Sequence, residues 1–263
     1  MKSHLGTAHT TSEEERLRFV RQGFAAAAPF YDALTWLFSF GLDGRWRRRC
    51  LDACELRPGD SLLDVATGTG ELAIGAAARV APAGGTVGID PCREMLLVAE
   101  GKARDSGRTV AWVQGVAESL PFKDEWFDCV TLGFALRHVA DLMGTLKEMV
   151  RVLKPGGRLG IVEFTRPEGT IIPLLLYAYL SSVVPPLVGL LSRSRPARDL
   201  ARYLPMTIRE FVSAEGLRRR MEAAGLASVT VRLYMAGMVG VCAGVKSVAF
   251  RPAPRNHSHS GEA

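Results

Sequence analysis

The stretch Asp64-Val65-Ala66-Thr67-Gly68-Thr69-Gly70-Glu71 decides the fold. It joins a short apolar run, residues 61–66, to a stretch with helical spacing, residues 71–80. Glycines at such a junction let a ligand approach the backbone where a side chain would clash. Asp90 ends the next apolar run, where a carboxylate can accept hydrogen bonds from both hydroxyls of a ribose. The loop and the acid together predict a nucleoside-binding site.

Beyond this loop, short apolar runs alternate with amphipathic stretches of helical length. Such alternation is typical of a parallel sheet that is covered by helices on both faces. The expected strands are residues 61–66, 86–90, 110–114, 127–133, 158–163, 229–234 and 238–246. The expected helices are residues 71–80, 93–106, 142–153 and 208–224. Only three residues, 235–237, join the last two strands, so we expect an antiparallel pair at one edge of a seven-stranded, Rossmann-like α/β sheet.

Two further regions flank or interrupt this pattern. Helical spacing from Ser12 to about residue 54, with breaks near Pro29 and Gly41, predicts a helical cap over residues 12–56. No charged residue occurs between Gly169 and Ser192, a length that could span a bilayer. Three prolines, at 173, 185 and 186, argue against one continuous helix. We therefore expect two apolar helices over the sheet edge, within a lid insertion at residues 169–204.

Composition bounds the remaining possibilities. The 263 residues, 48% of them hydrophobic, suit one domain, expected over residues 12–250 between disordered ends at 1–11 and 251–263. The net charge of +6 fits an anionic membrane, an acidic substrate or RNA, but is also common without such partners. The densest basic run, Arg45 with Arg47, Arg48 and Arg49, is interpreted as a solvated helix face. The five cysteines form no CxxC pair, so we expect reduced packing residues and no metal site. Reduced cysteines, and first eleven residues that lack a signal peptide's apolar core, indicate a cytoplasmic protein.

NAD is the alternative ligand of the glycine loop. Gly68, Gly70 and Ala73 satisfy the relaxed G-x-G-x-x-G/A pattern of dinucleotide-binding folds. Two carboxylates near the loop, Asp64 and Glu71, instead suit a ligand that carries a positive charge better than a pyrophosphate. The late start of the loop and the final antiparallel pair also favour such a ligand. The stretch from Gln114 to Phe122 could bind an adenine through free backbone amides, or form a plain turn.

Several longer motifs carry a resemblance to a known family. They are Arg151-Val152-Leu153-Lys154-Pro155-Gly156-Gly157-Arg158 with Val162-Glu163-Phe164-Thr165, Phe134-Ala135-Leu136-Arg137-His138-Val139, Tyr31-Asp32 ahead of Ser39-Phe40-Gly41-Leu42, and Gly237-Met238-Val239. In these motifs the chain resembles the menaquinone and ubiquinone biosynthesis C-methyltransferases, from about residue 24 to residue 246. The resemblance implies a class I methyltransferase fold, S-adenosylmethionine as cofactor and a prenylated quinol as substrate. The expected cofactor-binding residues are Asp64, Gly68, Thr69, Gly70, Asp90, Val116, Ala117 and Gly133.

The chain also departs from the family pattern. The family usually has an acid where Val116 stands, Asn where His138 stands, and His-Arg where Cys242 and Ala243 stand. These departures leave two alternatives open. One is a methyltransferase for another small hydrophobic acceptor, such as a secondary metabolite or a sterol-like molecule. The other is a non-catalytic ligand- or RNA-binding module, against which the glycine loop and Asp90 argue.

Methylation of a ring carbon needs help from the protein. Such a carbon is a poor nucleophile until a ring hydroxyl loses its proton, so a base or a phenolate-stabilising group must assist. Arg137 and His138 follow the fourth expected strand at the ligand-binding edge of the sheet. We expect Arg137 to stabilise the phenolate, His138 to take the proton, and Glu163 to orient both. The alternatives are an ion pair of Arg137 with Asp141 and a surface position for His138.

The apolar segment suggests the remaining partners. An apolar channel or lid formed by residues 169–192 would bury a polyprenyl tail, with Tyr177 and Tyr179 as polar groups at its rim. The alternative is a core-packed helical pair. We also expect peripheral membrane contact, no nucleic-acid partner, and a homodimer as a candidate assembly.

Overall fold

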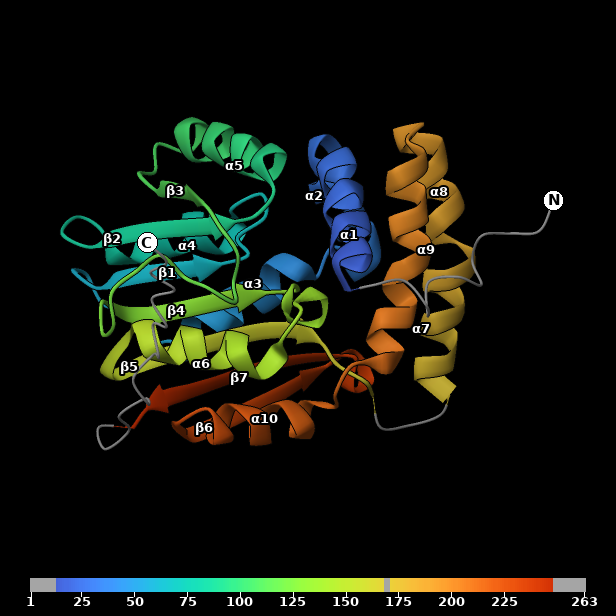
Figure 1. Ribbon diagram of the computed structural model, residues 1–263. Coiled ribbons are helices and arrows are strands. Elements are labelled where there is room, and N and C mark those ends of the chain that lie inside the picture. Colours follow the sequence, from blue (N-terminus) through green and yellow to red (C-terminus); the bar gives the residue numbers. More distant parts are fainter. Residues whose placement is uncertain (1–12, 168–170, 248–263) are drawn as a thin grey trace, which may run out of the picture.

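A seven-stranded mixed sheet forms the centre of the protein (Figure 1). The computed structural model describes residues 13–167 and 171–247. The strand order is β3-β2-β1-β4-β5-β7-β6, and β7 runs antiparallel to both neighbours. The strands are β1 (Ser61–Val65), β2 (Gly85–Asp90), β3 (Ala111–Gln114), β4 (Phe127–Gly133), β5 (Leu153–Phe164), β6 (Leu226–Tyr234) and β7 (Val239–Lys246). This arrangement confirms the predicted fold class.

Helices cover both faces of the sheet. α3 (Asp43–Ala53) and α4 (Glu71–Val80) cover one face, and α6 (Leu142–Val152) and α10 (Ala214–Ala223) cover the other. α5 (Arg93–Asp105) packs beside β2 and β3. Strands that are apolar on both sides explain two separate core clusters, one on each face, because alternate side chains of a strand point to opposite faces.

A group of helices stands against the carboxyl ends of the strands, to the right of the sheet in Figure 1. It consists of α1 (Glu13–Ala27), η2 (Ala28–Phe30), α2 (Tyr31–Ser39), α7 (Ile171–Ser182), α8 (Val184–Ser192) and α9 (Arg195–Glu210). α9 packs against α1 on one side and α8 on the other. The predicted N-terminal helices and the apolar helical insertion before β6 are therefore both present.

The apolar insertion forms two helices, as predicted, with Val183 between them. Pro185 lies at the start of α8, where a missing N–H costs least. The two helices pack against α9, and α8 also contacts α2, at the carboxyl side of the sheet. By length and composition alone, Pro173–Leu190 could cross a membrane, and 28% of this stretch is buried inside the protein.

One predicted helix is wrong, and β2, β5 and β6 each begin before the predicted strand. Residues 208–224 do not form one helix, because α9 ends at Glu210 and α10 begins at Ala214. The Ser213 hydroxyl accepts a hydrogen bond from the Gly216 amide, and this cap starts a new helix. β5 begins five residues before the predicted strand. The predicted cap at Ser12 and both predicted disordered ends lie outside the described residues.

Candidate functional site

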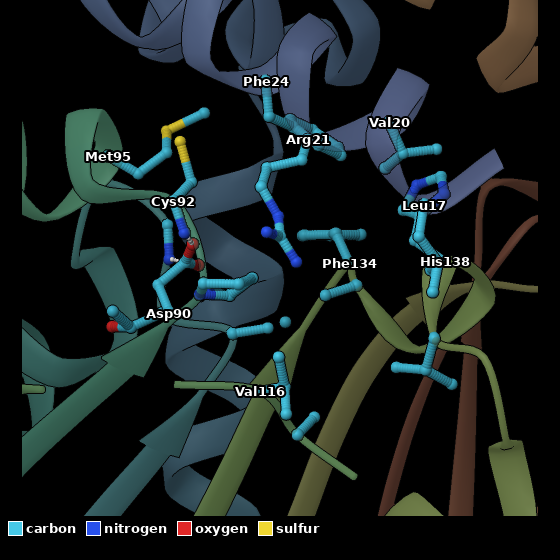
Figure 2. A pocket seen from close by; sticks show the side chains of 18 of the residues that line it. Leu17, Val20, Arg21, Phe24, Asp90, Cys92, Met95, Val116, Phe134 and His138 are labelled. Atoms are coloured by element: carbon cyan, nitrogen blue, oxygen red, sulfur yellow. Dashed lines mark hydrogen bonds between the residues drawn. The ribbon is translucent and has the colours of Figure 1, made fainter. Parts of the chain in front are cut away.

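A cavity of about 350 Å³ lies between the carboxyl ends of the strands and helix α1 (Figure 2). This volume is in the range of small-molecule sites, about 300–1,000 Å³. Seven of the predicted site residues line it: Gly68, Thr69, Asp90, Val116, Ala117, Gly133 and His138. Two other predicted cofactor residues, Asp64 and Gly70, and two predicted catalytic residues, Arg137 and Glu163, do not line it.

Local backbone geometry shapes the glycine loop. Gly70 has a φ of 82°, and a Cβ there would lie 2.7 Å from the Trp112 ring, so only glycine fits this turn without displacement. A Cβ at Gly68 would meet nothing within 4 Å, so its backbone faces open space. Ala66 also has a positive φ, 52°, which is rare for a residue with a side chain and occurs frequently at functional sites. The loop is thus held in an unusual shape that exposes its backbone to a ligand.

Asp64 supports this loop from beneath. Its side chain is buried, and its two oxygens accept hydrogen bonds from the hydroxyls of Thr67, at 2.6 Å, and Thr131, at 2.7 Å. Burial raises the pKa of Asp64 to about 6, although these hydroxyls lower it. The carboxylate therefore orders the loop and has no free face toward the cavity.

Asp90 lies at the end of β2, at the edge of the cavity (Figure 2). Its Oδ1 accepts a hydrogen bond from the Cys92 amide and its Oδ2 accepts one from the Gly68 amide, both at 2.8 Å. Burial raises the pKa of Asp90 to about 6, while these amides and the nearby Arg21 guanidinium lower it. Each oxygen keeps further lone pairs that can accept from the hydroxyls of a ribose.

Thr69 connects the glycine loop to the cap. Its hydroxyl donates to Asp32 Oδ1 at 2.6 Å, and Asp32 belongs to α2. Lys102 of α5 donates to Asp32 Oδ2 at 2.6 Å and also to Glu71, the first residue of α4. Three helices are thus tied together beside the loop.

Sequence reasoning missed the contribution of α1. Leu17, Val20 and Phe24 of this helix form an apolar wall of the cavity. Arg21 extends from the same helix into the space between Asp90 and Phe134 (Figure 2). No local motif marks these residues, because the contact joins chain segments far apart in sequence.

A second, smaller cavity of about 40 Å³ adjoins the first. The two cavities share Phe24, Tyr31 and Phe134. The remaining lining of the second cavity is almost entirely apolar and comes from α1, α2 and α9 together with Phe164 and Arg137. It is therefore an apolar space with one cationic group in its wall, directly beside the larger cavity.

Arg137 and Glu163 form a buried ion pair at this second cavity. The exposed fractions of the two side chains are 5% and 0%. Arg137 also donates to the Phe134 carbonyl at 3.0 Å and to the Thr207 hydroxyl of α9 at 3.2 Å. Burial raises the pKa of Glu163, although Arg137 lowers it. The alternative pairing of Arg137 with Asp141 is therefore wrong.

His138 faces the first cavity and not the second. It is buried, so the alternative of a surface histidine is wrong. Neither ring nitrogen has a hydrogen-bond partner among the described residues, and the ring meets Phe24 edge-on at 5.5 Å between centroids. Burial lowers the pKa of His138 well below its usual value, helped by Arg137 and Arg16. The imidazole is consequently neutral near pH 7.

The basic run in α3 is not uniformly solvated. Arg45, Arg48 and Arg49 are exposed as expected, whereas Arg47 is buried. Helical periodicity turns position 47 inward together with Trp46 and, one turn on, Cys50. Arg47 lines the first cavity, with its guanidinium 5.0 Å from the centre of the Phe134 ring. The sequence prediction for this residue is wrong.

The sheet order, the glycine loop and the nucleoside-sized cavity define a class I methyltransferase fold. Among solved structures, an S-adenosylmethionine-dependent methyltransferase from Aquifex aeolicus matches with a TM-score of 0.54 and 21% identity, over 76% of this chain and 89% of that one. The CurJ carbon methyltransferase matches with a TM-score of 0.58 and 15% identity, over 80% of this chain and 55% of that one.

Sequence relatives narrow the class to a family. The model of the ubiE/COQ5 methyltransferase family matches residues 9–246, and the chain belongs to this family. A demethylmenaquinone methyltransferase of Thermus thermophilus is 41% identical over 84% of this chain and 98% of its own length. A ubiquinone/menaquinone biosynthesis C-methyltransferase of Vibrio cholerae is 36% identical over 93% of both chains. The protein is thus a methyltransferase whose cofactor is S-adenosylmethionine, and NAD is the wrong alternative.

Proposed function

We propose that this enzyme transfers a methyl group to a ring carbon of a prenylated quinol in menaquinone or ubiquinone biosynthesis. The observation that carries the proposal is the pair of adjoining cavities, one over the glycine loop and one apolar with Arg137 in its wall. The names of the relatives, a demethylmenaquinone methyltransferase and a ubiquinone/menaquinone C-methyltransferase, support the same acceptor class.

The first cavity suits the cofactor. Asp90 would accept from the ribose hydroxyls, and the backbone of Val116 and Ala117 would border the adenine. Gly68 and Thr69 would hold the methionyl part from the loop, and Gly133 would approach it from the end of β4. Asp64 and Gly70 act indirectly, by fixing the shape of the loop. When bound, S-adenosylmethionine supplies a methyl group on a positively charged sulfur.

The second cavity, at about 40 Å³, holds only part of an acceptor ring. The ring would lie where the two cavities meet, beside Phe134 and Tyr31, so its carbon could face the methyl group. The Arg137 guanidinium would stabilise a phenolate on that ring, since a buried cation favours an anion beside it. Glu163 holds Arg137 in place. Activation of the acceptor ring would therefore depend on the Arg137 cation, held in position by Glu163.

His138 is the proposed proton acceptor, directly or through water. Neither ring nitrogen is hydrogen-bonded to a described residue, so the unprotonated nitrogen of the neutral ring is free to accept a proton. Burial lowers the pKa of His138, which makes it a weaker base than an exposed histidine. His138 lines the cofactor cavity and Arg137 lines the second cavity, so His138 would take the proton where the two cavities adjoin. Val116 and His138, two positions at which this chain differs from the usual family residues, line the cofactor cavity. Neither residue belongs to the apolar lining of the second cavity.

The apolar insertion at residues 169–204 would serve as the lid for the polyprenyl tail. α7 and α8 expose Leu174, Leu175 and Leu190 by 67%, 64% and 76%. Trp36 of α2 and Phe40, which follows it, are also exposed, and α2 contacts α8. Exposed large apolar side chains of this kind fit peripheral contact with the membrane in which a prenylated substrate is dissolved. Sedimentation with liposomes tests this contact, and sedimentation equilibrium tests the candidate homodimer.

A direct assay tests the acceptor class. Purified enzyme is incubated with ¹³C-methyl-labelled S-adenosylmethionine and either a reduced prenylated naphthoquinol, a reduced prenylated benzoquinol or a sterol. We expect the label on a quinol ring carbon, detected by mass spectrometry and NMR. Labelling of the sterol alone, or of a quinol oxygen, would contradict the proposal.

A further inference from the structure

Arg47 is a buried cation that the proposed function does not use. Its exposed fraction is 9% and it makes no hydrogen bond to any described residue. Its Nε is buried without a partner, and the nearest ion-pair contact is 3.7 Å from Asp43 Oδ2. Burying a charge is costly unless the charge is paired and hydrogen-bonded. A guanidinium in this state is ready to bind an anion.

The neighbouring carboxylates are already engaged. Asp43 accepts a hydrogen bond from the Ser39 hydroxyl at 3.1 Å through its other oxygen. Asp64 accepts from Thr67 and Thr131. Glu163 accepts a hydrogen bond from the Arg137 guanidinium. Among the described residues, the long contact with Asp43 is therefore the only ion pair of Arg47.

The position of Arg47 limits which anion it can meet. It lines the first cavity and is absent from the lining of the second. A Cβ at Gly133 would lie 2.9 Å from Arg47 Nη1, so the guanidinium touches the backbone at the end of β4. In the sheet, β1 separates β4 from β2, which carries Asp90. Strand spacing therefore puts Gly133 on the order of 10 Å from the end of β2.

We propose that Arg47 binds the α-carboxylate of S-adenosylmethionine. This carboxylate is the anionic group of the cofactor, and the methionyl chain separates it from the ribose. With the ribose at Asp90, the chain leads past the glycine loop toward Gly133 and Arg47. The planar guanidinium can donate two parallel hydrogen bonds to a carboxylate. The inference rests on the proposed placement of the ribose, and deepens it by naming the group that fixes the opposite end of the cofactor.

Ligands with and without the carboxylate test this contact. Binding of S-adenosylmethionine and of its decarboxylated analogue is measured by isothermal titration on the wild type, on Arg47→Met and on Arg47→Lys. We expect the wild type to prefer the carboxylated ligand by roughly 10- to 100-fold. In Arg47→Met this preference falls to a few-fold at most, while the affinity for the decarboxylated analogue stays unchanged. Arg47→Lys keeps part of the preference.

Arg48→Met is the matched control, because Arg48 is an exposed neighbour on the same helix. It should leave both affinities unchanged. Asp90→Ala should weaken both ligands alike, which separates a failure of the ribose placement from a failure at Arg47. An unchanged preference in Arg47→Met would overturn the proposal, as would a wild type without any preference. An intact preference together with a raised KM for the quinol would assign Arg47 to the acceptor and likewise overturn it. The binding titrations need no turnover, so they are independent of the identity of the acceptor; only the KM measurement requires the quinol.

Discussion

Replacement of Glu163 by glutamine tests the buried ion pair that positions Arg137. The substitution leaves the Arg137 cation without a counter-charge in a site where both side chains are almost fully buried. Breaking a buried pair in this way costs about 3–5 kcal/mol of the free energy of unfolding. In a protein of this size each kcal/mol lowers Tm by about 2–4 °C. Because glutamine keeps an oxygen that can accept from Arg137, we expect the lower half of that range, about 3–4 kcal/mol, and a fall in Tm of roughly 6–16 °C.

Thermal unfolding followed by circular dichroism measures this change, and a double-mutant cycle interprets it. Burial raises the pKa of Glu163 even though Arg137 lowers it, so burial of this carboxylate outweighs the attraction of Arg137. Removing both charges in Glu163→Gln/Arg137→Met should therefore cost less than Glu163→Gln alone. Strictly additive losses in the cycle would refute the coupling. Arg137→Met should also bind S-adenosylmethionine normally while its kcat falls about 10²- to 10³-fold.

Three further predictions concern the cofactor site, the cap and the apolar face. Affinity for S-adenosylmethionine should fall as the pH drops through about 6, because a protonated Asp90 is a weaker acceptor for the ribose. Titrations at several pH values should show an affinity independent of pH in Asp90→Asn but not in Asp64→Asn. Lys102→Met removes a partly exposed ion-pair link between α2 and the cofactor loop, which is worth about 0.5–1 kcal/mol. The Kd for S-adenosylmethionine should therefore rise about 2- to 5-fold in the same titration. An unchanged Kd would count against coupling of the cap to the site. Leu174→Glu with Leu175→Glu should abolish liposome sedimentation without changing Tm, whereas persistent sedimentation would place the membrane contact elsewhere.

Much of the fold follows from local signals. The alternation of apolar runs with amphipathic stretches predicted all seven strands, and the three-residue connection predicted the antiparallel edge. The break between α9 and α10 was missed because apolar residues continue the helical spacing through it, while the Ser213 cap decides against it. Local propensity and periodicity compete at such points, and periodicity alone cannot show which prevails.

The candidate site was predictable only where the sheet itself supplies the residues. Asp90, Gly68 and Gly133 end strands or begin loops, and a parallel sheet brings such positions to one edge. The contribution of α1 depends on long-range packing, for example the hydrogen bond from Arg16 to the Val139 carbonyl across 123 residues. Arg47 was misassigned because a run of arginines resembles a solvated face, and only the packing of α3 shows which of them turns inward.

The central claim is that the two adjoining cavities bring S-adenosylmethionine and a quinol ring together beside Arg137. The most direct measurement is single-turnover methyl transfer from ¹³C-labelled cofactor to a reduced prenylated quinol, with cofactor binding measured in parallel, for the wild type and Arg137→Met. The account predicts a labelled ring carbon with the wild type, and normal cofactor binding with severely slowed transfer in the variant. Normal cofactor binding with no transfer to either quinol by the wild type, or undiminished transfer by Arg137→Met, would contradict it.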